Sequence, residues 1–161
     1  MRKRWRLSPS DAYIKGRSAA FYNFAGEPQT ALRLLDEAAI LDPFLHIWCV
    51  EERVAALYNV GQFREAIDAA MRLTWQTRRS RLYRAACHAA LGEHIAAREA
   101  VAEAIANAPG LTTEFVEIHE TYRDQDVKRK LIDLLVASGL PRRPRRVSAD
   151  SSKRQVMAQA S

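Results

Sequence analysis

Cysteine is scarce in this sequence, with Cys49 and Cys87 as the two residues among 161, and neither belongs to a Cys-x-x-Cys pair. Such usage indicates free, partly buried thiols in a reducing compartment. A zinc site is a weaker alternative, because His46 lies three residues before Cys49 and His88 follows Cys87. Adjacent residues on a helix point about 100° apart, so Cys87 and His88 would rarely reach one ion together. We therefore expect no metal site.

Long apolar runs are also absent, since no stretch approaches the roughly 18 residues of a membrane span. The amino terminus is charged but no apolar stretch follows it, which excludes a secretory signal peptide. A length of 161 residues suits a single domain. We expect a cytoplasmic protein without a membrane partner.

Catalytic motifs are missing as well. The sequence contains neither a glycine-rich loop of the kind that holds phosphates nor a His-Glu-x-x-His zinc motif. Glu51 and Glu52 form an acidic pair in a helical pattern, and we interpret this pair as solvent-exposed surface, not as an acid/base dyad. We expect no catalytic residues and no cofactor.

A short phrase, by contrast, occurs three times: a glycine followed five positions later by an alanine. The copies read Gly26-Glu-Pro-Gln-Thr-Ala31, Gly61-Gln-Phe-Arg-Glu-Ala66 and Gly92-Glu-His-Ile-Ala-Ala97. The glycines lie 35 and then 31 residues apart, close to the roughly 34-residue period of helix-turn-helix solenoids. Glycine at the turn accepts the left-handed conformation that ends a helix. The spacing predicts an all-α fold.

Small residues recur at fixed distances from these glycines, and at helix crossings they let backbones approach to about 8–10 Å. The residues expected to have this packing role, without direct functional contact, are Ala19, Gly26, Ala31, Ala38, Gly61, Ala66, Ala85, Gly92, Ala97 and Ala104. The pattern resembles the tetratricopeptide repeat. This resemblance implies a right-handed helical solenoid of about three units, at about residues 10–43, 44–77 and 78–110.

The amino-terminal end resembles a boundary between two repeat units, because Pro9 precedes Pro43 by 34 residues. We interpret residues 1–9 as the remnant of a preceding repeat helix. The chain would then be the later part of a longer array, through truncation, a mis-assigned start or a small stand-alone paralogue.

The carboxyl-terminal end keeps its helical periodicity after the repeat phrase stops. Phe115, Ile118 and Tyr122 mark one short helix, and Asp124 is the expected N-cap of a second. Residues 111–140 are therefore expected to form a pair of capping helices, since the end of a solenoid needs a polar outer face. Residues 141–161 are expected to be a disordered basic tail.

The net charge of +6 is concentrated at the two ends. Residues 1–7 carry +4 and residues 141–161 carry +5, whereas residues 8–140 carry −3. A basic tail attracts phosphates without sequence preference, so weak, non-specific nucleic-acid binding is one hypothesis. Solvating charge is the more common role of such a tail, and Arg145-Arg-Val-Ser148 also matches a weak phosphorylation motif.

Stacked repeats line their concave surface with the first helix of each unit. The residues expected to face it and to bind a protein or peptide partner are Tyr13, Asn23, Trp48, Glu51, Tyr58, Arg79 and Leu82. Tyrosine, tryptophan and arginine are the commonest anchors of interfaces. The alternative is that Trp48 and Tyr58 pack against neighbouring helices.

A longer resemblance runs from Leu41-Asp-Pro43 through Gly61-Gln-Phe-Arg-Glu-Ala-Ile67 and Leu82-Tyr-Arg-Ala-Ala-Cys87 to Ser138-Gly-Leu-Pro141. These segments are similar to the terminal repeat region of bacterial multidomain regulators, notably class III adenylate/guanylate cyclase proteins. No cyclase catalytic residue carries over to this chain. The sequence thus favours a non-catalytic protein-interaction scaffold. A regulatory fragment of a cyclase-like protein and a nucleic-acid-associated regulator are the alternatives, and the oligomeric state is left open.

Overall fold

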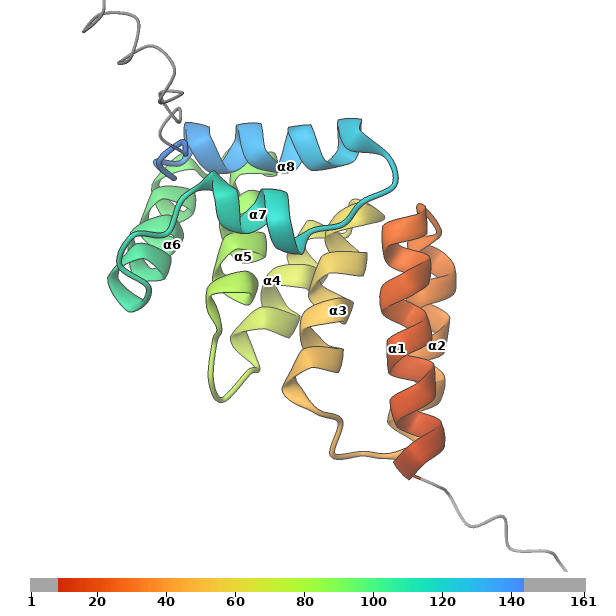
Figure 1. Ribbon diagram of the computed structural model, residues 1–161. Coiled ribbons are helices and arrows are strands. Elements are labelled where there is room, and N and C mark those ends of the chain that lie inside the picture. Colours follow the sequence, from red (N-terminus) through yellow and green to blue (C-terminus); the bar gives the residue numbers. More distant parts are fainter. Residues whose placement is uncertain (1–8, 144–161) are drawn as a thin grey trace, which may run out of the picture.

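The computed structural model describes residues 9–143, and its regular elements in that range are all helices, with no strand. Their bounds are α1 Pro9–Ala25, α2 Pro28–Leu41, α3 Ile47–Asn59, α4 Phe63–Met71, α5 Arg78–Ala90, α6 His94–Asn107, α7 Thr113–His119 and α8 Gln125–Ala137. They pack in sequential pairs, α1 with α2, α3 with α4, α5 with α6 and α7 with α8 (Figure 1). The expected all-α fold is confirmed. None of these helices is both long and apolar enough to cross a membrane.

The three repeated glycines close the turns inside the first three pairs. Gly26, Gly61 and Gly92 have φ of 94°, 81° and 77°, in the left-handed region that a side chain disfavours. The alanines singled out for packing all have 0% exposed surface: Ala19, Ala31, Ala38, Ala66, Ala85, Ala97 and Ala104. The small side chains thus lie where the helices meet.

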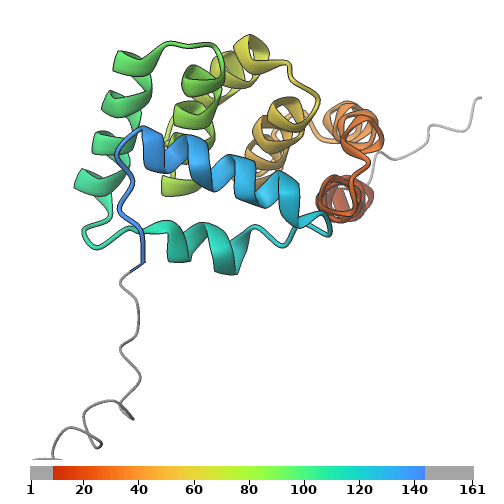
Figure 2. The ribbon, with the colours of Figure 1, turned by 90° about the horizontal axis from the view of Figure 1, so that it is seen from above.

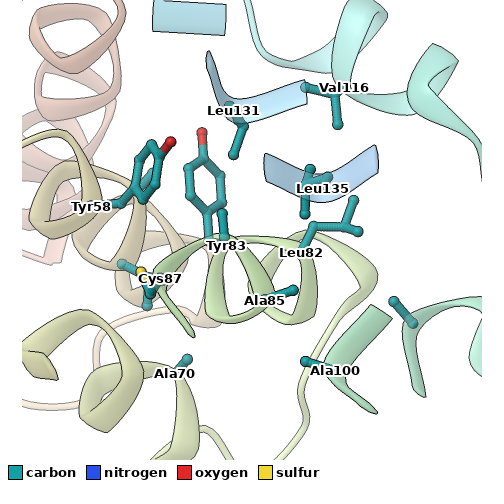
Figure 3. Close-up of a cluster of buried hydrophobic side chains, with 14 of the residues drawn as sticks. Tyr58, Ala70, Leu82, Tyr83, Ala85, Cys87, Ala100, Val116, Leu131 and Leu135 are labelled. Atoms are coloured by element: carbon teal, nitrogen blue, oxygen red, sulfur yellow. The ribbon is translucent and has the colours of Figure 1, made fainter. Parts of the chain in front are cut away.

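Two groups of buried side chains form the core. A smaller group joins α1 and α2 to α3 through Ala19, Leu35 and Cys49. The larger group extends from α3 to α8 and includes Tyr83 and Leu135 (Figure 3). Because α8 contributes to this larger core, the carboxyl-terminal helices are part of the main body of the fold.

The last two helices differ from the expected capping pair in their limits. α7 ends at His119, so Tyr122 lies outside any helix, and the expectation that it marks a helical face is wrong. Asp124 does cap α8, where its carboxylate accepts a hydrogen bond from the Asp126 amide at 2.8 Å. Figure 1 shows α8 running crosswise to α3 and α5. Figure 2 shows α1 and α2 together at one edge of the molecule.

The ends of the described range also differ from expectation. Pro9 belongs to α1, one residue before the expected start of the first unit, and the rest of the expected helix remnant, residues 1–8, lies outside the described range. Residues 141–143 are ordered against α7: the Thr113 amide donates to the Pro141 carbonyl at 3.0 Å, and the Arg143 guanidinium lies 3.2 Å from Glu114. The rest of the basic tail, with its Ser148 motif, lies outside the described residues.

Candidate functional site

The first helices of the three repeat pairs, α1, α3 and α5, share a face that the chain itself partly covers. The seven residues expected on this face fall into two sets. Asn23, Tyr58 and Leu82 are buried, with 1%, 8% and 3% exposure, and the Arg79 side chain is 15% exposed. At the other end Tyr13 is 54% exposed, and Trp48 and Glu51 are half-buried. The expected groove is therefore not an open one along its whole length.

Residues 120–123 bind part of this buried set, Arg79 directly and Asn23 through Asn59, and we call them the crossing segment. They link α7 to α8 outside any helix, with φ and ψ of −94° and 88° at Glu120. Glu120 and Tyr122 point inward, with 1% and 3% exposure, while Thr121 and Arg123 are exposed. This alternation is the period of an extended strand, and it gives the segment one face toward α1, α3 and α5.

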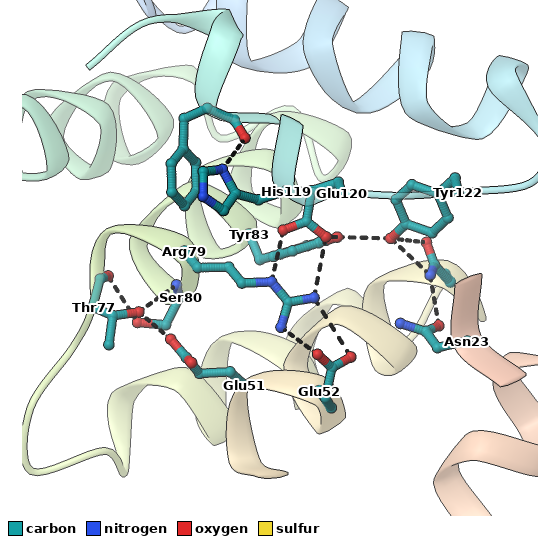
Figure 4. Close-up of polar contacts among 12 residues, drawn as sticks. Asn23, Glu51, Glu52, Thr77, Arg79, Ser80, Tyr83, His119, Glu120 and Tyr122 are labelled. Atoms are coloured by element: carbon teal, nitrogen blue, oxygen red, sulfur yellow. Dashed lines mark hydrogen bonds and ion pairs between the residues drawn. The ribbon is translucent and has the colours of Figure 1, made fainter. Parts of the chain in front are cut away.

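Arg79 on α5 holds the acidic end of the crossing segment. Its guanidinium donates to Glu120 at 2.6 Å and 3.1 Å and to Glu52 on α3 at 2.8 Å (Figure 4). Arg79 is thus shared between two carboxylates and does not project as a free anchor. The sequence-based role of Arg79 as an exposed binding residue is corrected accordingly.

The charges of this cluster are tuned by burial. Burial acts to lower the pKa of Arg79, but the hydrogen bond to Glu120 and the neighbouring charges outweigh it and raise that pKa above its ordinary value. Burial raises the pKa of Glu52, and the charge of Arg79 offsets part of that rise. Glu52 is therefore a weaker acid than an ordinary glutamate, with its pKa above the usual value.

A chain of hydroxyl and amide groups holds the aromatic end of the crossing segment. The Asn59 side-chain amide donates to the Tyr122 hydroxyl at 2.9 Å, the Tyr122 and Tyr83 hydroxyls lie 2.7 Å apart, and Tyr83 donates to Glu120 at 2.7 Å (Figure 4). Asn59 also donates to the Asn23 side-chain oxygen at 2.7 Å. This network joins α1, α3 and α5 through one extended segment.

The main chain adds a further contact, because the Arg123 amide donates to the Phe24 carbonyl at 2.9 Å. The Phe24 ring meets the Tyr122 ring edge-on, with centroids 5.1 Å apart. A main-chain bond plus pockets for alternate side chains is the way in which proteins commonly bind extended peptides.

Sequence reasoning missed several residues of this network. They are Glu52, Asn59, Tyr83, Glu120 and Tyr122. The expectation that Glu51 and Glu52 are both solvent-exposed is wrong, because Glu52 is 8% exposed and bound to Arg79, and Glu51 is half-buried and accepts a hydrogen bond from Thr77. The sequence offers no local signal for them, because Glu120-Thr-Tyr-Arg123 does not alternate between apolar and polar residues, and the alternation in burial appears only in the structure.

The uncovered end of the shared face is aromatic and acidic. Tyr13 is 54% exposed and meets the half-buried Trp48 ring edge-on, with centroids 5.6 Å apart. Glu51 lies one turn further along α3. We call Tyr13, Trp48 and Glu51 the open end of the face.

The cysteine and histidine residues considered for zinc do not converge. Cys49 and Cys87 belong to different core groups, His88 contacts Glu93, and within residues 9–143 no three potential ligands lie close enough to hold a metal ion. Burial raises the pKa of Cys49 to about 11 and that of Cys87 to about 12. Both thiols are therefore protonated at neutral pH and poor nucleophiles.

No protein-family model, no curated protein and no solved structure matches this chain. The tetratricopeptide-like repeat and the likeness to cyclase-type regulators stay predictions from the sequence. The site is consequently defined by its geometry: a face shared by three helices, partly filled by an extended segment and partly open.

Proposed function

We propose that this chain is a non-catalytic protein-interaction module. Its helix pairs correspond to tetratricopeptide-like units of a right-handed solenoid, and its partner is an extended segment of another protein. The repeated turn glycines with positive φ and the fully buried alanines support this assignment.

The observation that carries the proposal is the binding of the crossing segment. Residues 120–123 contact all three first helices: Phe24 on α1, Asn59 on α3, and Arg79 and Tyr83 on α5. The contacts combine a main-chain hydrogen bond, an ion pair and an aromatic pocket. A face that holds one extended segment in this way has the chemistry to hold another.

The partner segment would lie on the open end of the face. Tyr13 offers a large exposed ring, the Trp48 ring packs edge-on against it, and the Glu51 carboxylate provides a hydrogen-bond acceptor. The other four expected residues contribute to this function indirectly. Arg79 binds the crossing segment, Asn23 is linked to it through Asn59, and Tyr58 and Leu82 belong to the larger core.

A site-specific photo-crosslinker tests this proposal. Tyr13→benzoylphenylalanine places the reactive group on the open end, and Ile95→benzoylphenylalanine on α6 is the matched control, because Ile95 is 69% exposed and outside the shared face. In a native cell extract we expect a discrete crosslinked protein from position 13 and none of that mass from position 95.

A second variant distinguishes specific binding of the partner at the open end from non-specific crosslinking. Glu51→Ala, with unchanged helicity by circular dichroism, should weaken the crosslink from position 13, because it removes the acceptor beside Trp48. Equal crosslinks from positions 13 and 95, or none from position 13, would contradict a binding role for the open end.

A further inference from the structure

The outward face of α1 is apolar, although α1 lies at the edge of the molecule (Figures 1 and 2). Ile14 and Phe21 are seven residues apart and therefore share one side of the helix. They are 60% and 68% exposed, whereas Ala12 and Ala19 on the opposite side are 2% and 0% exposed. We call the side that carries Ile14 and Phe21 the outward face.

The repeat shows what this face does in the other units. Ile14 lies twelve residues before Gly26, and Cys49 and Ser80 lie twelve before Gly61 and Gly92. Phe21 lies five before its glycine, and Ala56 and Cys87 lie five before theirs. In α3 and α5 these four residues have between 0% and 2% exposure. Cys49 and Ala56 pack against Ala31 and Leu35 of the preceding pair. The outward face is thus the surface on which a helical neighbour packs.

The large size of Ile14 and Phe21 indicates that the partner of the outward face is not a helix pair of the kind that packs on α3 and α5. Where α3 and α5 meet the preceding pair, the four equivalent side chains are small, which allows close helix approach. Isoleucine and phenylalanine at the same places would overlap a pair that packed as the chain's own pairs do. A plain end unit would have a polar outer face. The outward face fits neither arrangement.

Two arginines border the outward face. Arg17 lies between Ile14 and Phe21 along the helix axis and to one side of them. Arg123 lines a hollow with Phe21, Phe24 and Ala25. Both arginines are exposed, and neither forms an ion pair with the part of the chain that the structure describes. An apolar stripe edged with unpaired positive charge complements a ligand with apolar and acidic groups.

We propose that the outward face of α1 is a second docking surface, which binds one amphipathic helix of a partner protein with acidic residues beside its apolar stripe. The stripe from Ile14 to Phe21 is two helical turns, about 10 Å long, and suits the anchors of a single helix at i, i+3 or i+4, and i+7. A second copy of this chain fits less well, because a two-fold axis on the stripe would bring the two Arg17 guanidinium groups together. This surface does not depend on the open end of the shared face.

A displayed library of amphipathic helices tests the proposal with the full chain as bait. The peptides have about 18 residues, enough for stable helix formation, with fixed leucines at one stripe and glutamate, lysine or glutamine varied beside it. We expect enrichment of glutamate-flanked peptides. Their affinity should fall at least about tenfold on Phe21→Ala, but less than about twofold on Phe44→Ala, since Phe44 is 90% exposed and lies off the face.

Charge reversal provides the second arm. Arg17→Glu/Arg123→Glu should shift enrichment from glutamate-flanked to lysine-flanked peptides, whereas Arg72→Glu at the end of α4 should leave it unchanged. Enrichment of neutral or basic peptides on the wild type, equal binding to Phe21→Ala, or no enrichment at all would overturn the proposal. A wild-type dimer in sedimentation that Phe21→Ala converts to a monomer would assign the face to a second copy instead.

Discussion

Arg79 is the residue that ties the crossing segment to the repeat helices. Its side chain is 15% exposed, and the side chains of its two carboxylate partners, Glu52 and Glu120, are 11% and 2% exposed. Removal of one partner from such a pair costs much more than the pair contributes, because the remaining charge stays buried without compensation. The cluster is therefore sensitive to each of its members.

Glu120→Ala should lower the free energy of unfolding by about 3 kcal/mol, because Arg79 loses two hydrogen bonds and Tyr83 loses its acceptor. Urea unfolding followed by circular dichroism measures the change. Glu117→Ala is the matched control, since its side chain is 42% exposed, and it should stay within about 0.5 kcal/mol of wild type. A loss below about 1 kcal/mol for Glu120→Ala would contradict a buried ion cluster.

The raised pKa of Glu52 has a consequence for pH dependence. The folded protein binds this proton more tightly than the unfolded chain does, so the stability contribution is full below the unfolded pKa near 4.5 and is lost as pH rises through the folded pKa. Glu52→Gln removes this titration and keeps an acceptor for Arg79. Relative to wild type, the variant should therefore gain stability between pH 4 and pH 7. Urea unfolding across this range would disprove the assignment if the difference between the two proteins stayed constant or changed in the opposite direction.

The first helices of neighbouring pairs approach each other closely at small residues, and the sequence predicts only some of these contacts. Gly16 in α1 lies against α3, and a Cβ there would come within 2.7 Å of the Cys49 sulfur and of the Trp48 ring. Both distances are below the shortest that real Cβ atoms show. The glycine is needed here for space, not for an unusual backbone conformation.

Gly16→Ala should consequently destabilise the fold by about 1–2 kcal/mol, because overpacking against the core outweighs the gain of up to about 1 kcal/mol in helix propensity. Ser18→Ala in the same helix is the control and should leave stability unchanged or slightly higher. In a double-mutant cycle, Cys49→Ala should recover part of the loss, since it removes the sulfur that the new methyl group meets. A higher melting temperature for Gly16→Ala than for wild type would contradict this prediction, because it would show that α1 and α3 can move apart enough to accept the methyl group.

The elements divide clearly into those that the sequence predicts and those that it does not. Gly26 and Gly61 mark their turns, and Asp124 marks the start of α8, because capping and turn chemistry are local. The helical spacing of Phe115, Ile118 and Tyr122 predicts that the helix continues into the crossing segment as far as Tyr122. What overrides that spacing is the contact of Tyr122 with Asn59, 63 residues away, which no local pattern contains.

The whole molecule is built around a core that includes its carboxyl-terminal part. Leu82 and Tyr83 on α5 belong to the same buried group as Tyr122, Leu131 and Leu135. Removal of the last helices would expose the shared face over α3 and α5. The repeat pairs and the carboxyl-terminal helices are therefore expected to unfold together.

A chain that ends at residue 110 should lose cooperative unfolding and bind a hydrophobic dye, because it exposes Leu82, Tyr83 and Tyr58 and leaves Arg79 and Glu52 without Glu120. A chain that ends at residue 143 is the control and should unfold as the full chain does. Calorimetry and dye fluorescence measure the two properties. Cooperative unfolding of the shorter chain near the wild-type temperature would show that the repeats form an independent unit.

The crossing segment also bears on the order in which the protein is made. Synthesis proceeds from the amino end, so α1 through α6 are translated before residues 120–123. Until those residues arrive, the groups that await them, among them Arg79 and Asn59, are left facing water or a chaperone. The crossing segment therefore completes the fold late in synthesis: a product that terminates before residue 120 keeps Arg79 and Asn59 without these partners.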